Sequence, residues 1–209
     1  MSPPSTQTHF SMIRGFHLAD FLTLGNAACG MIALFQVVVY GETREPSRLL
    51  TASALIPLAF ALDALDGWIA RWRRKHSAMG RELDSLADVI SFGVAPAVIA
   101  YGAGMQGLWD AAILIYFVAC GVSRLARFNI TAEQLSTEGG KVKYFEGTPI
   151  PTTLVLVGVV AGLAWFGKVG DALPFGTIGI GPWLLHPLTL LWALSGSLMI
   201  SKTIRIPKI

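Results

Sequence analysis

Long apolar stretches constrain the fold of this chain more than any other feature of its sequence. A helix needs about 20 mostly apolar residues to cross the hydrocarbon core of a bilayer. Six stretches reach or approach that length: 18–40, 50–71, 84–105, 108–128, 150–167 and 182–201. The first carries no lysine or arginine from Leu18 to Tyr40. The sequence therefore predicts an all-α integral membrane protein with six transmembrane helices.

The composition agrees with a membrane protein. Of the 209 residues, 53% are hydrophobic and 14% are charged, whereas soluble domains carry about 25% charged residues. This shortage of charge excludes a disordered protein, a nucleic-acid binder and an ordinary soluble enzyme. The two cysteines, Cys29 and Cys120, lie inside apolar stretches without C-x-x-C spacing. We therefore expect two buried free thiols rather than a disulfide or a zinc site.

The stretches leave one long connection. Residues 131–147 are polar and contain Gly139-Gly140, which predicts a loop there. We expect a single membrane-embedded domain over residues 1–209. Its first part, residues 1–10, has the composition of a flexible polar tail and lacks the pattern of a cleavable signal peptide.

Basic residues predict the orientation in the membrane. With six spans, both termini share one side with the second–third and fourth–fifth connections. That side holds thirteen basic residues, and the opposite side holds Arg44, Arg48 and Lys168. The thirteen are Arg14, Arg71, Arg73, Arg74, Lys75, Arg81, Arg124, Arg127, Lys141, Lys143, Lys202, Arg205 and Lys208. By the positive-inside rule, both termini lie in the cytoplasm. We expect a multi-pass protein of the cytoplasmic membrane, with Trp109, Trp165 and Trp183 near its outer boundary.

Four aspartates stand where an apolar helix would avoid them. Asp63 and Asp66 end the second stretch, and Asp84 and Asp88 open the third. Each charge at mid-helix in a bilayer costs about 2.5–3.5 kcal/mol, and less near the interface. Residues three or four apart share a helix face, so a short turn after Trp72 would bring the two acidic pairs together. Converging carboxylates favour Mg²⁺ or Mn²⁺, and two divalent cations balance four negative charges better than one.

A structural interpretation of these acids is also open. Asp84 alone would serve equally well as a helix cap, and Glu82 fits the N-terminus of the third helix. Asp63 and Asp66 lie at the wrong end of their helix for capping. Beside them, Gly67 leaves room for a ligand to approach the backbone.

Arg71, five residues after Asp66, can reach a phosphate. Ala70, like Gly67, is small enough to leave space around such a ligand. Two cations beside an arginine form a site for chemistry on a pyrophosphate, because they offset charge that develops on a leaving group. The sequence therefore predicts a pyrophosphate-processing site at the aspartates.

At these positions the chain resembles a known family. The pattern Asp63-x-x-Asp66-Gly67-x-x-Ala70-Arg71, eight residues, Gly80-x-x-x-Asp84-x-x-x-Asp88 is similar to the signature of the CDP-alcohol phosphotransferases. The resemblance implies a homodimer of six-helix protomers with a polar cavity facing the cytoplasm. It also implies a dinuclear metal site made by the four aspartates, with Asp88 as general base. The nucleotide and pyrophosphate site would comprise Asp66, Gly67, Ala70, Arg71 and Gly80, with Thr23 and Asn26 from the first helix.

Three further segments resemble the phosphatidylserine synthase branch of that family: Asp88-Val-Ile-Ser-Phe-Gly-Val-Ala-Pro, Arg124-Leu-Ala-Arg127-Phe-Asn129 and Phe145-Glu-Gly147-Thr-Pro149-Ile-Pro151. The chain departs from the branch at Ala19-Asp20, where Pro-Asn is common. It departs again at Thr148, Thr152 and Thr153, which replace apolar residues. Both departures add polarity near the expected cavity.

Several side chains have two interpretations, one as ligand-binding residues and one as structural residues. Arg124 and Arg127, with Asn129, would bind the acceptor's carboxylate or a lipid phosphate, or the arginines would simply be positive-inside charges. Thr23 and Asn26 would contact the nucleotide or pack against another helix.

The expected function is transfer of the phosphatidyl group from CDP-diacylglycerol to the hydroxyl of L-serine, giving phosphatidylserine and CMP. Within the same chemistry, the acceptor would instead be glycerol 3-phosphate, inositol phosphate, choline or another amino alcohol. From other classes, a divalent-cation transporter or a structural membrane subunit remains open. A transporter leaves Gly67, Ala70 and Arg71 unexplained.

Overall fold

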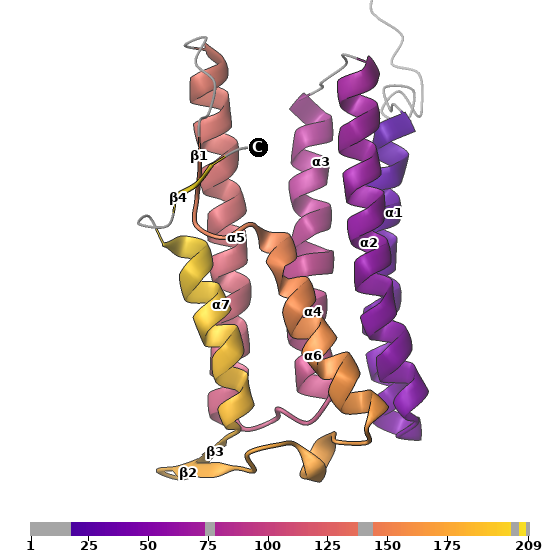
Figure 1. Ribbon diagram of the computed structural model, residues 1–209, viewed down its shortest axis with the longest axis vertical. Coiled ribbons are helices and arrows are strands. Elements are labelled where there is room, and N and C mark those ends of the chain that lie inside the picture. Colours follow the sequence, from indigo (N-terminus) through magenta and orange to yellow (C-terminus); the bar gives the residue numbers. More distant parts are fainter. Residues whose placement is uncertain (1–17, 74–77, 138–143, 202–204, 208–209) are drawn as a thin grey trace, which may run out of the picture.

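The computed structural model describes residues 18–73, 78–137, 144–201 and 205–207. The tail expected over residues 1–10 and the Gly139-Gly140 pair lie outside these ranges. Within them the chain is mostly helical, with two short pairs of strands (Figure 1).

The α-helices are α1 (Leu18–Thr43), α2 (Pro46–Arg73), α3 (Ala78–Asp88), α4 (Ala95–Gly102), α5 (Leu108–Thr137), α6 (Leu154–Trp165) and α7 (Leu190–Ile200). A π-helix, η2 (Val89–Val94), joins α3 to α4. Three short 3₁₀ turns are η3 (Ile150–Thr153), η4 (Gly170–Ala172) and η5 (Pro187–Thr189). Proline stands in the first turn of α4, η3 and η5, where its missing N–H leaves no helical hydrogen bond unmade.

Within the described residues, four helices are long and apolar enough to cross a membrane: Leu18–Thr43, Pro46–Ile69, Met79–Gly102 and Leu108–Thr131. They confirm the first four predicted stretches. The fifth and sixth correspond to shorter apolar helices, Ile150–Trp165 and Pro187–Ile200. The protein is thus a helical membrane protein. Cys29 and Cys120 are buried free thiols, as expected.

The loop predicted over residues 131–147 is wrong at both of its ends, because α5 continues to Thr137 and Tyr144–Glu146 form a short strand. Residues 131–137, Thr-Ala-Glu-Gln-Leu-Ser-Thr, contain good helix formers and neither glycine nor proline. Nothing in this segment ends the helix, so α5 extends beyond its apolar part.

The start predicted for the sixth helix, residue 182, is also wrong. Strand β2 (Ile178–Ile180) pairs antiparallel with β3 (Trp183–Leu185), and α7 begins only at Leu190. Gly181 (φ 64°) and Pro182 form the two-residue turn between the strands. A glycine with positive φ at the first turn position suits a tight hairpin, so these apolar residues form a hairpin instead of helix.

The third helix begins earlier than its apolar stretch. Ala78 already lies in α3, so Asp84 falls six residues inside the helix. The capping interpretation of Asp84 is therefore wrong. Glu82 likewise lies beyond the first turn described for α3.

The helices form an antiparallel bundle (Figure 1). α1 packs along α2, α3 and α4, and α5 packs along α7, while α6 contacts α2 and α4. Strand β1 (Tyr144–Glu146) pairs antiparallel with β4 (Arg205–Pro207). The β2–β3 hairpin lies across the end of the bundle where α4 ends and α5 begins. The C-terminal end of α2 and the N-terminal part of α3 lie at the opposite end.

Close packing of α1 on the π-helix depends on Gly30. A Cβ there would meet Ser91 Oγ at 2.6 Å and Ile90 Cγ2 at 3.0 Å. We expect Gly30→Ala to lower the free energy of unfolding by about 1–3 kcal/mol, because the added methyl overpacks the interface. Gly158→Ala in α6 is the matched control, since a Cβ there meets nothing within 4 Å. Thermal unfolding of the two purified variants measures the difference, and equal stability would contradict the packing argument.

Candidate active site

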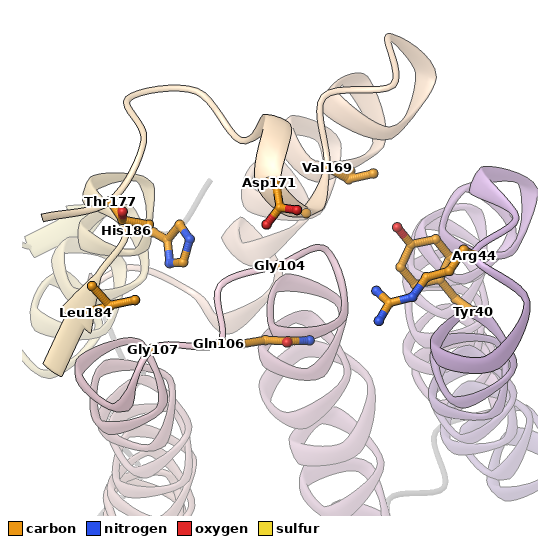
Figure 2. A pocket seen from close by; sticks show the side chains of 11 residues that line it. Tyr40, Arg44, Gly104, Gln106, Gly107, Val169, Asp171, Thr177, Leu184 and His186 are labelled. Atoms are coloured by element: carbon orange, nitrogen blue, oxygen red, sulfur yellow. The ribbon is translucent and has the colours of Figure 1, made fainter.

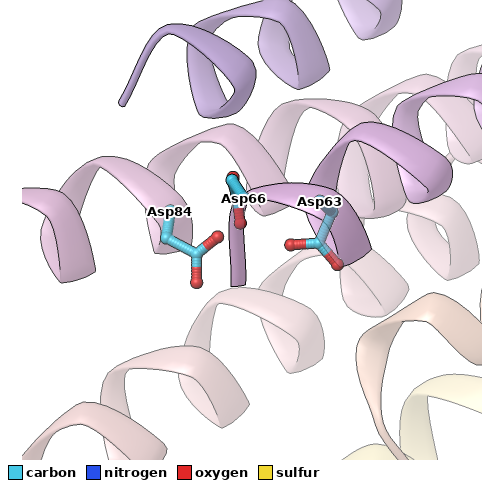
Figure 3. A group of neighbouring side chains, drawn as sticks. All are labelled: Asp63, Asp66 and Asp84. Carbon is cyan, nitrogen blue, oxygen red and sulfur yellow. The ribbon is translucent and has the colours of Figure 1, made fainter. Parts of the chain in front are cut away.

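Three of the predicted aspartates come together between α2 and α3. Ligand oxygens of Asp63, Asp66 and Asp84 lie within 4.8 Å of one another. Figure 3 shows the carboxylates of Asp63 and Asp84 directed toward each other on either side of Asp66. Asp66 is buried and the other two are half-buried. Residues 74–77, which follow α2, lie outside the described ranges, and the cluster is built by the C-terminal part of α2 and by α3.

Asp88 lies one helical turn from Asp84, at the junction of α3 with the π-helix. It is buried and stands outside the group of three. Its Oδ1 accepts a hydrogen bond of 3.2 Å from Asn26 Nδ2. The charges of Asp63, Asp66 and Asp84 act on it electrostatically, as does that of Arg124 from α5. Asp88 therefore belongs to the same polar region without sharing the tight cluster.

Helix α1 covers the aspartates with buried polar side chains. Thr23 Oγ1 donates a hydrogen bond of 2.5 Å to Asp66 Oδ2. Asp20, three residues before Thr23, is buried on the same side of α1. Thr23 and Asn26 each contact one of the aspartates directly: Thr23 bonds Asp66, and Asn26 bonds Asp88.

Ser91 is a site neighbour that sequence reasoning missed. Its hydroxyl donates a hydrogen bond of 2.8 Å to the backbone carbonyl of Asn26, so it fixes the residue that holds Asp88. The signal was present as Asp88-x-x-Ser91, a spacing that places two polar groups on one helical face. The π-helix widens that turn, and the sequence pattern does not reveal the π-helix.

Two buried oxygens near the cluster have no hydrogen-bond partner among the described residues: Asp84 Oδ1 and Asn26 Oδ1. An unsatisfied buried acceptor costs about 1–3 kcal/mol. A cation would satisfy Asp84 Oδ1 and offset the repulsion among neighbouring carboxylates. A donor set made only of carboxylate oxygens is the kind that Mg²⁺ and Mn²⁺ prefer. The residues present therefore fit a divalent metal site.

The other motif residues occupy different places around the cluster. Gly67 in α2 and Gly80 in α3 are half-buried. The backbones of Ala70 and Arg71 continue α2, but their side chains lie outside what the structure describes.

On α5, Asn129 Nδ2 donates a hydrogen bond of 2.9 Å to Ser85 Oγ, next to Asp84 in the chain. Arg127 Nη1 donates a long hydrogen bond of 3.5 Å to the carbonyl oxygen of Ile200 at the end of α7. Arg124 thus interacts with the acidic region, whereas Arg127 braces two helices.

Thr23 offers a test of the metal site that is independent of any reaction. We expect Thr23→Val to weaken Mn²⁺ binding about 10–100-fold, the usual cost of removing a group that orients a metal ligand. Thr23→Ser keeps the hydroxyl and should bind Mn²⁺ as the natural chain does. Titration of Mn²⁺ followed by electron paramagnetic resonance gives the affinities. Unchanged binding by Thr23→Val would show that its contact with Asp66 does not support a metal.

The chain is similar to known proteins over almost its whole length. A family model described as CDP-alcohol phosphatidyltransferase matches residues 16–194, which include all the aspartates above. The CDP-diacylglycerol--serine O-phosphatidyltransferase of Saccharomyces cerevisiae is 45% identical over 207 residues, covering 98% of this chain and 75% of that protein.

Bacterial and archaeal relatives match a shorter part. The CDP-diacylglycerol--serine O-phosphatidyltransferase of Bacillus subtilis is 36% identical over 137 residues, 65% of this chain and 70% of that protein. The archaetidylserine synthase of Methanothermobacter thermautotrophicus is 38% identical over 143 residues, 67% of this chain and 55% of that protein.

Proposed function

The chain belongs to the CDP-alcohol phosphatidyltransferase family, and we propose that it transfers the phosphatidyl group of CDP-diacylglycerol to the hydroxyl of L-serine. The products are phosphatidylserine and CMP. The observation that carries this proposal is the convergence of carboxylates from α2 and α3, in a chain similar along its length to a serine phosphatidyltransferase.

Asp63, Asp66, Asp84 and Asp88 would hold two divalent cations, Mg²⁺ or Mn²⁺. Bound there, the cations supply charge stabilisation to the pyrophosphate and to the departing CMP. Gly67, Ala70 and Gly80 leave space for the nucleotide, Arg71 pairs with a phosphate, and Thr23 and Asn26 complete that site from α1. The short contact of Thr23 with Asp66 and the contact of Asn26 with Asp88 support this placement.

Asp88 is the proposed general base. It accepts the proton of the serine hydroxyl as that oxygen attacks the phosphorus bearing the diacylglycerol, and the bond from this phosphorus to CMP breaks. A base must keep one oxygen free. The position of Asp88 outside the tight group of three carboxylates supports that requirement. Asn26 holds its Oδ1, which leaves Oδ2 for the hydroxyl.

Arg124 is the proposed partner of the serine carboxylate, because it is a half-buried cation on α5 that lies near enough to Asp88 to feel its charge. A guanidinium matches the two oxygens of a carboxylate. Arg127 and Asn129 support this subsite from the same helix, and their contacts with Ile200 and Ser85 favour a bracing role.

We also propose how the chain is arranged in the membrane. Six spans, with both termini in the cytoplasm, would form one catalytic domain over residues 1–209. It would act as a homodimer in the cytoplasmic membrane, with the aspartates facing the cytoplasm. The distribution of basic residues supports this orientation, since Arg44, Arg48 and Lys168 lie at the bundle end away from the aspartates.

Release of CMP by the purified protein tests the function. With CDP-diacylglycerol and Mn²⁺, we expect rapid CMP release with L-serine. Glycerol 3-phosphate, inositol phosphate or choline should give little, because none offers a free carboxylate to Arg124. Faster release with another acceptor would overturn the serine assignment. Cation flux through proteoliposomes without CMP release would favour a transporter instead.

A further inference from the structure

A cavity of about 620 Å³ lies at the end of the bundle opposite the aspartates (Figure 2). Three connections meet there: the α1–α2 turn, the α4–α5 turn and the segment between α6 and α7. Its polar lining includes Arg44, Gln106, Asp171 and His186. The volume falls in the range of small-molecule sites. None of these residues takes part in the reaction proposed above.

Arg44 stands in a strained backbone conformation at this cavity. Its φ is 55°, and among described non-glycine residues only Phe175, with φ 70°, shares a positive value. Arg44 directly follows α1, a position where glycine is preferred. Its guanidinium carbon lies 5.9 Å from the centre of the Tyr40 ring, and within the described ranges no carboxylate pairs with it. Strained residues cluster at ligand sites, so the cavity beside Arg44 is a candidate for such a site.

A buried network fixes the other side of the cavity. The fully buried Asp110 carboxylate accepts hydrogen bonds from Gly107 N (2.8 Å), His186 N (2.9 Å) and Thr189 Oγ1 (2.8 Å). It also lies 2.6 Å from His186 Nδ1. Because Asp110 accepts at every contact, His186 presents Nδ1–H to it and the rest of the ring lines the cavity (Figure 2). A satisfied network of this kind holds the connections in place.

Exposed apolar side chains beside the cavity favour a position at a membrane surface. No residue between Asp171 and His186 is charged. The exposed apolar side chains of this segment include Phe175 (78%), Ile178, Trp183 and Leu184. The rings of Trp109 and Trp183 meet edge to face at 5.6 Å, and Trp109 Nε1 donates a hydrogen bond to Ile180 O. Tryptophans at the ends of spans mark the level of the lipid head groups.

We propose that this cavity binds the head group of a phospholipid from the leaflet opposite the aspartates, one that carries a phosphate and a primary ammonium group. The guanidinium of Arg44 matches the phosphate. The carboxylate of Asp171 matches the ammonium group. His186 and Gln106 add hydrogen-bonding groups, and the apolar β2–β3 hairpin lies against the glyceride.

Binding of phosphatidylethanolamine to the purified full-length protein tests this site, by native mass spectrometry and thermal unfolding in detergent. The variants Arg44→Gln and Arg44→Gly should bind it about tenfold more weakly or worse, since each loses a charged hydrogen-bond donor. Arg44→Gly relieves the backbone strain, so it should be at least as stable as the natural chain without lipid. The control is Arg48→Gln, which removes a cation at the same end that bonds Glu45 and does not line the cavity.

A comparison of two lipid head groups provides a second test of the site. Asp171→Asn should remove the preference for phosphatidylethanolamine over phosphatidylglycerol. Equal loss of binding in the Arg44 and Arg48 variants, or no binding by the natural chain, would overturn the proposal. Equal stabilisation by glycerophosphoethanolamine, which has no acyl chains, would also overturn it in favour of a soluble phosphate ester. These probes are neither substrate nor product of the proposed transfer, so the result is independent of that function.

Discussion

Replacing Asp88 by asparagine should lower the turnover number about 10²–10⁴-fold, the usual contribution of a general base. Asparagine has nearly the same shape and its side-chain oxygen still accepts a hydrogen bond from Asn26, but it cannot take up the proton of the serine hydroxyl. Binding of CDP-diacylglycerol should change little. CMP release under saturating substrates measures the rate, and calorimetry measures the binding.

The matched control for this variant is Glu82→Gln, which removes an exposed carboxylate from the same helix. It should retain full activity. An Asp88→Asn protein that turns over normally would remove Asp88 from the role of base. A variant that binds substrate poorly would instead assign Asp88 mainly to the metal site.

Asp63→Asn and Asp84→Asn should act on the metal. Each removes one negative charge from a cluster whose ligand oxygens lie within 4.8 Å. Even groups that only orient a ligand contribute 10–100-fold to metal affinity, so loss of a direct ligand should raise the Mn²⁺ concentration for half-maximal activity by about 100-fold or more. Chelation of the metal should abolish activity of the natural protein, and added Mn²⁺ should restore it.

Excess Mn²⁺ distinguishes the aspartates that bind the metal from the aspartate that acts as general base. It should partly rescue Asp63→Asn and Asp84→Asn and should leave Asp88→Asn inactive. A second measurement does not depend on turnover: Mn²⁺ should raise the unfolding temperature of the natural protein, because it relieves repulsion among the carboxylates, and should do so less in the two variants. Equal stabilisation of all three proteins would contradict a metal site at this cluster.

The sequence predicted the part of the site that follows from helical spacing. Asp63 and Asp66 are three residues apart, Asp84 and Asp88 are four apart, and few residues of the sequence separate α2 from α3. These local rules place carboxylates on facing sides of α2 and α3. They do not reveal which carboxylate stands apart, because that depends on Asn26 and on the π-helix after Asp88.

Two features at the other end of the bundle were not predicted, one set by a local turn and one by a contact distant in sequence. Apolar residues 178–185 have a composition that suits either a helix or a strand, and the Gly181-Pro182 turn decides for a hairpin. His186 shows no ligand spacing in the sequence. Its partner Asp110 lies 76 residues away, and only the fold brings the pair together.

The π-helix η2 separates the third membrane span into two independently oriented halves. It accommodates one more residue per turn than an α-helix would, and each residue of an α-helix rotates the chain by about 100°. Deletion of one residue within Val89–Val94 would restore regular α-helix and swing Asp84 and Asp88 away from α2, with Ile99 and Ala100 still seated in the core. The wide turn therefore sets the direction of the carboxylates in α3 separately from the packing of α4. Such a deletion would therefore remove Asp84 and Asp88 from the carboxylates that α2 contributes.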